Sequence, residues 1–354
     1  MSEDSFLDDG TWEYFWHPVC TLDELESADR GRGPILEATL LGRPLAIAKT
    51  SDGAAAFENR CPHRSAKLSL GWIKDDIIQC PYHGWRYRSD DGVCIEIPAL
   101  PDGPIPQRAR ATRYDCRIAY DLVWVRLKNE ADTQIPAHPV WDDPAFKCVM
   151  GPPYSWKTHA ARRLENFTDL AHFPFVHPET LGNAQETAFE KPVIDFEPEA
   201  RLRFRYVPAS GARSAADSTG RMSPLAYTDY TITLPFGVTL ELALQNGERS
   251  VLWLWASPID SKHCRSFWFT CRNRDHDGPD APHVEMQHRI LNEDIDIVES
   301  QQPEEIPHPR DEVAIGPDKV SLTYRKCLHS LSKAAERDAA DGVAQYISTA
   351  RKGI

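Results

Sequence analysis

Long apolar runs are missing from this sequence. Val251–Ala256 is one of its apolar stretches and is only long enough for a strand, whereas a membrane-spanning helix needs about 20 such residues. The first residues, Met1–Ser5, contain no basic segment followed by an apolar one, so we expect no secretory signal. Both absences argue against a membrane or secreted protein.

Positive charge is also scarce. Lys and Arg total 40 against 53 Asp and Glu, which gives a formal net charge of −13. Nucleic acids and anionic membranes bind basic surfaces, so we expect neither as a main partner. No Gly-x-Gly-x-x-Gly fingerprint occurs in the chain, and we therefore expect no dinucleotide site of its own.

Cysteines are present but lack the regular spacing of a disulfide framework. There are nine, an odd number, scattered along 354 residues, which favours reduced thiols in a cytoplasmic protein. Hydrophobic residues make up 41% of the chain and charged residues 26%, as is usual for a soluble globular protein. The length suits two domains, each with its own core.

Two of the cysteines stand close to histidines. Cys61–His63 reads Cys-Pro-His, and Cys80–His83, after sixteen intervening residues, reads Cys-Pro-Tyr-His. A Rieske [2Fe–2S] centre is held by two cysteines on one iron and two histidines on the other. A structural zinc site is the main alternative, but zinc modules usually pair like ligands within an arm. The two mixed arms therefore predict a Rieske cluster on Cys61, His63, Cys80 and His83.

The first part of the chain reads as short strands separated by turns, among them an Asp91-Gly92 hairpin turn. The expected strands are Pro44–Lys49, Ala54–Asn59, Ile77–Gln79, Gly84–Arg88, Val93–Ile97 and Leu122–Leu127. We predict an all-β domain over residues 12–130, with the two arms on hairpin-like loops. A proline-bearing stretch, Ile135–Pro153, is expected to be a linker.

The second part changes character. Residues 159–178 carry helical signals, and helical segments around 282–302 and 317–340 end the chain. The expected strands between them are Leu202–Val207, Ala226–Leu234, Val238–Leu244, Ser250–Ala256 and Ser266–Arg272, with a turn at Gln245–Glu248. This order predicts an α+β domain over residues 150–354, in which an antiparallel, helix-grip-like sheet wraps a helix. The segment 208–224 is rich in Ala, Ser and Gly and is expected to be a mobile loop.

A second metal site is indicated by two histidines, His172 and His177, on either side of Pro174. The proline should end or kink the helix and bring His177 back toward His172. Two imidazoles and one carboxylate on one face of an iron leave positions open for O₂. The candidate carboxylates are Asp294, as the best choice, with Asp296 and Glu293 as alternatives. Such a histidine pair more often belongs to packing or surface, but a one-electron donor in the same chain favours an iron.

With these motifs in view, the chain resembles the Rieske non-haem iron oxygenases over nearly its whole length. The family pattern Asn-x₂-Asp-x₂-His-x₄-His is present in full as Asn166, Asp169, His172 and His177. Segments 15–20, 61–71, 165–169 and 318–326 are similar to the methylxanthine N-demethylases, in the oxygenase-only branch with the vanillate and dicamba O-demethylases. The family's carboxylate falls on Asp294. Asp121 stands where a glycine is common, a departure that we expect to be harmless.

The resemblance implies a terminal monooxygenase that hydroxylates or oxidatively demethylates a small aromatic or heterocyclic substrate. It implies a Rieske cluster and a mononuclear Fe(II), with electrons from a separate NAD(P)H-dependent flavin and iron–sulfur reductase or a ferredoxin. Members of this branch form head-to-tail homotrimers. Asp169, with Asn166 in the same catalytic set, would then bridge His172 to His83 of the partner subunit.

Two other functions stay open. A cis-dihydroxylating dioxygenase would use the same iron site, although its catalytic subunits are generally longer, and a Rieske electron carrier would need no second metal. The substrate is not identified by these motifs. The candidate pocket aromatics are Phe173, Phe175, Trp253 and Trp255, although aromatic residues on strands and helices more often belong to the core. Arg64, Arg86 and Arg88 flank the arms and either form a basic rim for an acidic electron donor or pair with carboxylates.

Overall fold

The computed structural model describes residues 9–181, 187, 192–206, 214–216 and 222–349. The chain divides into two compact units, Glu13–Ile135 and a second unit made of Pro136–Ile354 with the residues up to Trp12. The first unit is built almost entirely of strands and the second combines an antiparallel sheet with helices, so the predicted α+β class is confirmed. No helix in the described ranges is long and apolar enough to cross a membrane.

The first unit contains two antiparallel sheets. Its elements are β1 (His17–Thr21), α1 (Leu22–Ser27), β2 (Ile35–Leu40), β3 (Arg43–Thr50), β4 (Gly53–Glu58), β5 (Trp72–Lys74), β6 (Ile77–Gln79), β7 (Arg86–Arg88), β8 (Cys94–Glu96), β9 (Arg113–Ala119) and β10 (Leu122–Arg126). Six strands pair in the order β1-β10-β9-β4-β3-β2 and four in the order β5-β6-β7-β8. Cys61 and Cys80 belong to an apolar core with Phe57, Ile78 and Tyr87, so both arms start from packed side chains.

Several turns of this unit use left-handed backbone, and two of them bear on the predicted turn residues. Gly92 has φ of 74° in the expected turn between β7 and β8. Between β9 and β10, Tyr120 and Asp121 have φ of 57° and 55°. Two successive residues with positive φ form the turn type that favours glycine in hairpins. Position 121 therefore suits a glycine because of its backbone conformation.

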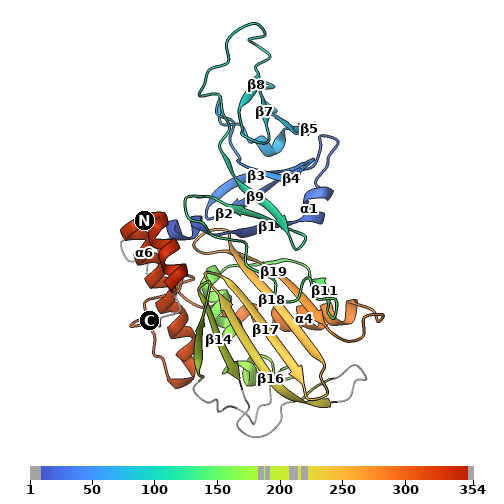
Figure 1. Cartoon of the computed structure of the whole chain (residues 1–354), viewed down its shortest axis with the longest axis vertical. Helices are drawn as coiled ribbons and strands as arrows, with labels where there is room; N and C mark the ends of the chain where they lie inside the picture. The colour runs from blue at the N-terminus through green and yellow to red at the C-terminus, as the bar shows by residue number, and fades with distance from the viewer. Residues whose placement is uncertain (1–8, 182–186, 188–191, 207–213, 217–221, 350–354) are drawn as a thin grey trace. The chain divides into compact units, whose positions relative to one another are not determined.

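The second unit is built on one nine-stranded sheet (Figure 1). Its strands are β11 (Lys147–Met150), β12 (Tyr154–Trp156), β13 (Ile194–Glu197), β14 (Arg201–Tyr206), β15 (Ser214–Ala216), β16 (Met222–Thr233), β17 (Gly237–Leu244), β18 (Arg249–Pro258) and β19 (Cys264–Arg272). They pair in the order β11-β19-β18-β17-β16-β14-β13, with β12 on β19 and β15 on β16. The predicted linker therefore ends in an edge strand, β11. Most of the expected loop 208–224 lies outside the described residues.

The helices of this unit are α2 (Ala160–Thr168), α3 (Phe173–Val176), α4 (Ala281–Glu293), α5 (Ile295–Glu299) and α6 (Lys319–Thr349), which is broken at Asp338 and Ala339. The predicted helix over 159–178 is thus two helices. The break comes at Asp169, whose backbone is extended and whose Oδ1 accepts the Ala171 N–H. A local side-chain bond of this kind competes with helical hydrogen bonds. Pro174 lies in the first turn of α3, where proline is tolerated.

Successive side chains of a strand point to opposite faces, and this sorts the sheet into two surfaces. Tyr230 of β16 is aligned through Leu240 with Leu252 of β18, and Phe167 of α2 contacts Tyr230 at 6.4 Å between ring centroids. We call this the helix face; α4 also lies on it, because His288 stacks on Trp268. The opposite, outer face carries the side chains that alternate with these.

Trp253 and Trp255 lie on the outer face. They follow Leu252 and Leu254 in alternation, and Trp253 contacts Phe269 at 5.8 Å between centroids. Both are almost completely buried. They are therefore separated by the sheet from α2 and the candidate metal ligands, and the interpretation of these two tryptophans as substrate-pocket residues was wrong.

The prediction of reduced thiols was wrong for one pair. Cys148 of β11 lies directly opposite Cys271 of β19 in the antiparallel register, and the two form a disulfide. They are 123 residues apart in the sequence, so only the pairing of the strands brings them together. The other seven cysteines form no disulfide.

Candidate functional site

The two cluster arms have the same backbone design. In the first, the Cys61 N–H bonds to the Ala66 carbonyl and the Ser65 N–H returns to Cys61. In the second, the Cys80 N–H bonds to the Trp85 carbonyl and the Gly84 N–H returns to Cys80. The residue four places after each cysteine has positive φ, 57° at Ser65 and 74° at Gly84. Each arm is thus a closed loop that presents one cysteine and one histidine.

The four predicted cluster ligands differ in solvent exposure. Cys61 and Cys80 are 2% and 1% exposed, whereas His63 and His83 are exposed at the tips of their arms. The two imidazole rings lie 4.6 Å apart between centroids. His63 is also stacked on Trp85 at 4.4 Å, with the planes 8° apart. Buried sulfur and exposed nitrogen suit a [2Fe–2S] group whose histidine-bound iron faces outward.

Tyr87 is a residue of this site that the sequence analysis missed. Its hydroxyl lies 3.1 Å from Cys61 Sγ. Hydrogen bonds lower the pKa of Cys61 to about 5, first from Cys80 and then, against the effect of burial, from Tyr87 and nearby backbone amides. The same pairing raises the pKa of Cys80. A thiolate is the form of cysteine that binds metal, so the arm favours ligation.

The expected basic rim is largely neutralised by neighbouring acids. Arg86 forms an ion pair with Glu96 at 2.7 Å, and Arg88 pairs with Asp90 and Asp91. These ion pairs largely cancel the positive charge around the second arm. For Arg86 and Arg88 the structure favours pairing with carboxylates, which here belong to the same chain, whereas Arg64 forms no ion pair with a described residue.

The second candidate site lies at three helix ends. His172 and His177 flank the short helix α3, and Asp294 is the residue between α4 and α5. His172 Nε2 and His177 Nε2 are 3.2 Å apart, and Asp294 Oδ1 lies 3.4 Å and 3.1 Å from them. The three ligand atoms all lie within 4.8 Å of one another. The break at Asp169 makes this possible, because it redirects the chain before His172.

These three side chains fit a mononuclear iron. Asp294 is 5% exposed, and no described residue gives its Oδ1 a hydrogen bond of good geometry, although both imidazoles lie close to it. Burial opposes the charge, yet the close imidazoles of His172 and His177 and the positive charge of Arg163 lower the pKa of Asp294 well below its usual range. Two histidines and one carboxylate form the ligand set of non-haem Fe(II) oxygenases.

Each imidazole has a carboxylate on its other nitrogen. Asp169 Oδ2 lies 3.2 Å from His172 Nδ1, and Glu293 Oε2 lies 2.8 Å from His177 Nδ1. Thr180 donates to the same Glu293 oxygen at 2.7 Å. Such partners fix the tautomer of a ligating histidine and raise its basicity. Glu293 is thus placed behind a ligand rather than in the ligand cluster, and the other alternative, Asp296, is exposed to solvent.

Asn166 is held by an arginine that the sequence analysis did not single out. Arg163 Nη1 donates to Asn166 Oδ1 at 2.6 Å, and its other nitrogens reach the Tyr154 hydroxyl. Arg163 is completely buried and lies over the Trp156 ring at 4.2 Å. A charged side chain is buried only when it is well paired. An arginine three residues before the motif asparagine, on the same helix face, was the available signal.

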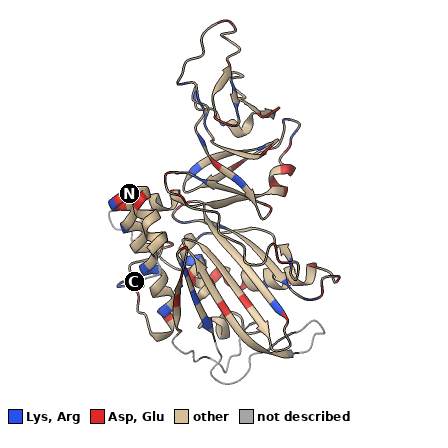
Figure 2. Cartoon of the chain, in the orientation of Figure 1, with Lys and Arg blue, Asp and Glu red and all other residues tan. Residues whose placement is uncertain are grey.

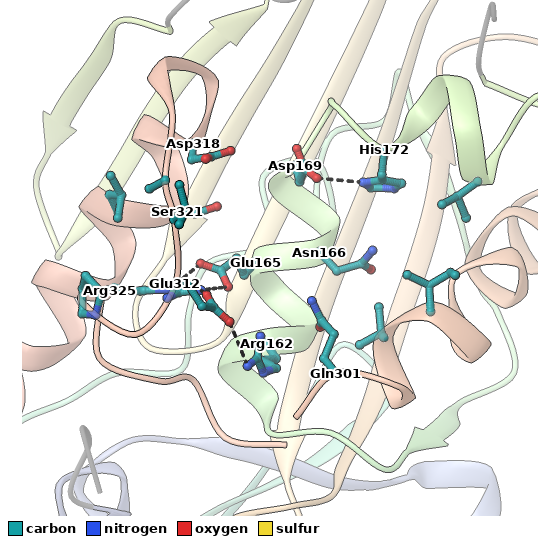
Figure 3. A pocket seen from close by; sticks show the side chains of 17 residues that line it. Arg162, Glu165, Asn166, Asp169, His172, Gln301, Glu312, Asp318, Ser321 and Arg325 are labelled. Atoms are coloured by element: carbon teal, nitrogen blue, oxygen red, sulfur yellow. Dashed lines mark hydrogen bonds and ion pairs between the residues drawn. The ribbon is translucent and has the colours of Figure 1, made fainter. Parts of the chain in front are cut away.

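A pocket of about 270 Å³ opens beside α2, on the side to which Asp169 points (Figure 3). Asp169, His172 and Asn166 line it. Charged groups line it too: Arg325 donates to both oxygens of Glu165 at 2.7 Å and pairs with Glu312 at 2.8 Å. Apolar side chains such as Val176, Ile297 and Leu322 also line it, so the pocket wall combines charged and apolar surface.

Of the candidate pocket aromatics on α3, Phe173 lies next to the metal ligands. Its ring centroid is 5.0 Å from that of His172 and 5.6 Å from that of His177. Phe175 points away and is 71% exposed. Phe173 therefore remains a candidate for contact with substrate, and Phe175 does not.

Comparison with known proteins supports a two-part architecture. Residues 15–111 match the family Rieske [2Fe-2S] domain, and residues 156–334 match the family Vanillate O-demethylase oxygenase C-terminal domain. A similar protein is methylxanthine N3-demethylase NdmB from Pseudomonas putida, 41% identical over 93% of this chain and 92% of that protein.

Three further matches concern proteins of the same organism. Methylxanthine N1-demethylase NdmA is 38% identical over 91% of this chain and 89% of that protein. The solved structure of NdmA with caffeine has a TM-score of 0.87 and 36% identity, and covers 97% of both chains. A shorter match, 37% identical over 32% of this chain and 18% of the other, is to the oxidoreductase NdmD.

Proposed function

The chain belongs to the Rieske non-haem iron oxygenases with a vanillate O-demethylase-type C-terminal domain, and we propose that it removes N-methyl groups oxidatively from a small heterocycle. It is the oxygenase component of a system with a separate reductase. The convergence of His172, His177 and Asp294 on one point carries the oxygenase chemistry of the proposal. The N-demethylase activity of two relatives, each similar over more than 90% of this chain, carries the substrate class.

The proposed iron site depends on what the surrounding side chains hold in place. When bound there, Fe(II) supplies the open positions and the electron that O₂ activation needs. His172 and His177 offer Nε2, because Asp169 and Glu293 keep the proton of each ring on Nδ1. Arg163 fixes the Asn166 side chain beside them. Phe173 contributes an apolar surface next to both imidazoles.

Electron supply is proposed to cross a subunit boundary in a head-to-tail homotrimer. Asp169 bonds to His172 and is 40% exposed on the pocket wall, so one carboxylate edge can accept a bond from His83 of the partner subunit. The fit is supported by apolar groups on both surfaces. Val313, which lines the pocket, is 96% exposed, and Tyr82 in the second arm is 62% exposed.

A substrate screen tests the proposed reaction. The protein is combined with an NADH-dependent flavin and iron–sulfur reductase and offered N-methylated purines, methyl aryl ethers and unsubstituted aromatic acids. Demethylation of the purines with one formaldehyde per methyl group removed is the expected result. Formaldehyde from the ethers alone would contradict N-demethylation, and a cis-dihydrodiol would indicate a ring dioxygenase.

Metal content gives a direct prediction for both centres. We expect about three irons per chain, two in the cluster and one at the histidine–aspartate site. Mixed ligation by Cys61, His63, Cys80 and His83 should give the reduced protein a Rieske-type electron paramagnetic resonance signal, with an average g value below that of the free electron. Two irons per chain would indicate an electron carrier. A colourless protein with stoichiometric zinc would contradict the cluster.

The role of Glu293 behind His177 gives a second prediction. Glu293→Gln removes the charge that holds the Nδ1 proton, so the affinity for mononuclear iron should fall by about tenfold to 100-fold. Equilibrium titration of the iron-depleted protein with Fe(II) measures it. Glu285→Gln, on the same helix but exposed, is the matched control and should leave the affinity unchanged. Equal affinities in the two variants would remove Glu293 from the site.

A further inference from the structure

A second cluster of reactive side chains lies on the outer face of the sheet. Cys148 and Cys271 form the disulfide between β11 and β19, and His138 Nε2 lies 3.8 Å from Cys271 Sγ. Cys271 is paired with Val251 of β18, which is two residues from Trp253 and therefore on the same face of the strand. Cys271 thus lies on the outer face, opposite to α2. The cluster therefore shares no ligand and no face with the proposed iron site.

The two sulfurs differ in accessibility. Cys148 lies on β11, an edge strand of the described sheet that pairs with β19, and is half-buried. Cys271 lies one strand further in and is completely buried. A thiolate that attacks a disulfide needs a straight approach to one sulfur, so access directs the attack to Cys148.

His138 is placed to assist departure of the other sulfur. The Val140 N–H points at His138 Nδ1 at 3.4 Å, which leaves the ring proton on Nε2, the nitrogen that faces Cys271. The ring is packed against Trp141, Trp253 and Phe269 at 5.4–5.6 Å between centroids. Burial lowers the pKa of His138 to about 4, so the ring is neutral at neutral pH and its Nε2–H is available as a donor.

We propose that Cys148–Cys271 is a reversible redox site in which Cys148 is attacked by a thiol reductant and Cys271 leaves as a thiolate hydrogen-bonded to His138. The attacking thiolate forms a mixed disulfide with Cys148, and the electron pair of the broken S–S bond goes to Cys271. The second thiol of a dithiol reductant then releases Cys148 as a thiol and becomes a disulfide itself. Two electrons and two protons pass to the protein, and the reverse exchange restores the bond.

The disulfide lies on a strand, β11, that precedes the helix α2 of the proposed iron site. The disulfide fastens β11 to β19, and the chain runs from β11 through β12 directly into α2. Opening the bond removes the covalent link and leaves β11 held by its ladder with β19 and by the contacts of Lys147 with Asp280 and the His276 carbonyl. A cross-link over 123 residues restricts the unfolded chain strongly, so the oxidised form is the more stable one.

The direction of attack is tested with glutathione, a monothiol that stops at the mixed disulfide. The oxidised holoprotein is incubated with glutathione, quenched with N-ethylmaleimide in denaturant so that the buried Cys271 is accessible, and digested for peptide mass spectrometry. Glutathione is expected on Cys148 and N-ethylmaleimide on Cys271, with at least about a tenfold preference. The reverse pattern, two free thiols in the air-exposed protein, or a bond that resists reduction in the folded state would overturn the proposal.

The part of His138 is tested by the rate of reduction with dithiothreitol. His138→Ala should slow the reaction by about tenfold, whereas His138→Gln, which keeps an N–H donor, should retain most of the rate. A merely structural role would slow both variants alike and would overturn the assignment. Cluster absorbance confirms that each variant is folded.

Stability provides a readout that does not depend on His138. Reduction should lower the melting temperature of the wild-type protein by about 5–10 °C. It should have no effect on Cys148→Ser, while Cys116→Ser, which alters a half-buried thiol outside the pair, should respond like the wild type. Retention of zinc on sulfur ligands by the reduced protein, seen by X-ray absorption, would instead make the trio a metal site and overturn the redox assignment.

Discussion

Replacing Asp169 with asparagine is expected to lower product formation by about 100-fold or more in samples saturated with Fe(II), in which both metal centres are loaded. Asparagine keeps the shape of the side chain but loses the negative charge that accepts a bond from His172 and, in the proposed trimer, from His83 of the partner subunit. The proposed iron ligands are untouched, so the failing step should be electron transfer between the centres. To isolate that step, the variant is fully reduced and mixed with O₂ and substrate, and reoxidation of the cluster is followed.

The matched control for this experiment is Asp318→Asn. Asp318 lines the same pocket, but its carboxylate accepts the Ile315 N–H and does not contact a metal-ligand histidine. Its loss changes the charge of the pocket wall by the same amount. Slow reoxidation in both variants would point to a general field effect, and normal reoxidation in Asp169→Asn would require another electron route.

Loss of one imidazole at the second site should abolish turnover without harming the cluster. His172→Ala removes one of three proposed ligands, so mononuclear iron should fall from about one per chain to near zero and product to the detection limit. The cluster arms belong to the other compact unit and share no residue with this site. Iron analysis with visible absorption measures both effects in one sample.

Two acids that lie two residues apart, Asp294 and Asp296, provide the control for the ligand assignment. Asp294→Ala should behave like His172→Ala, whereas Asp296→Ala, two residues further on α5 and exposed, should keep iron and activity. Iron retention by Asp294→Ala would contradict the ligand assignment. Loss of the cluster bands in folded His172→Ala would contradict the independence of the two sites.

The cluster arms could be predicted from sequence because their geometry is local. Each arm closes within six residues through hydrogen bonds between its own backbone groups. The spacing of cysteine and histidine in the sequence therefore determines how they are presented in the structure. Strands were likewise predicted where apolar alternation and turn residues coincide, as at Asp91-Gly92 and Asn246-Gly247, whereas strands such as β1, β2, β9 and β13 were not predicted. The shared positive φ of Ser65 and Gly84 was not predicted, because serine rarely adopts this conformation.

Features that depend on distant parts of the chain were missed. Glu293 next to Asp294 reads as another acid on a helix, and only the packing of α4 near His177 shows its position behind that ring. The partner of Cys148 is set by the register of β11 on β19. The end of α2 was placed at Pro174 on the basis of backbone sterics alone, whereas the Asp169 side chain ends the helix earlier.

The outermost strands of the nine-stranded sheet also bear on how the protein behaves at high concentration. In the described sheet, β11 and β13 end the main order, and each has only four residues. β13 alternates Asp195 and Glu197 with apolar residues, and β11 begins with Lys147, which is paired with Asp280. Short, charged outer strands are poor templates for pairing with another chain. This sheet is thereby protected against edge-to-edge aggregation, and the subunit contacts of the proposed trimer would have to come from side-chain surfaces such as the pocket beside α2.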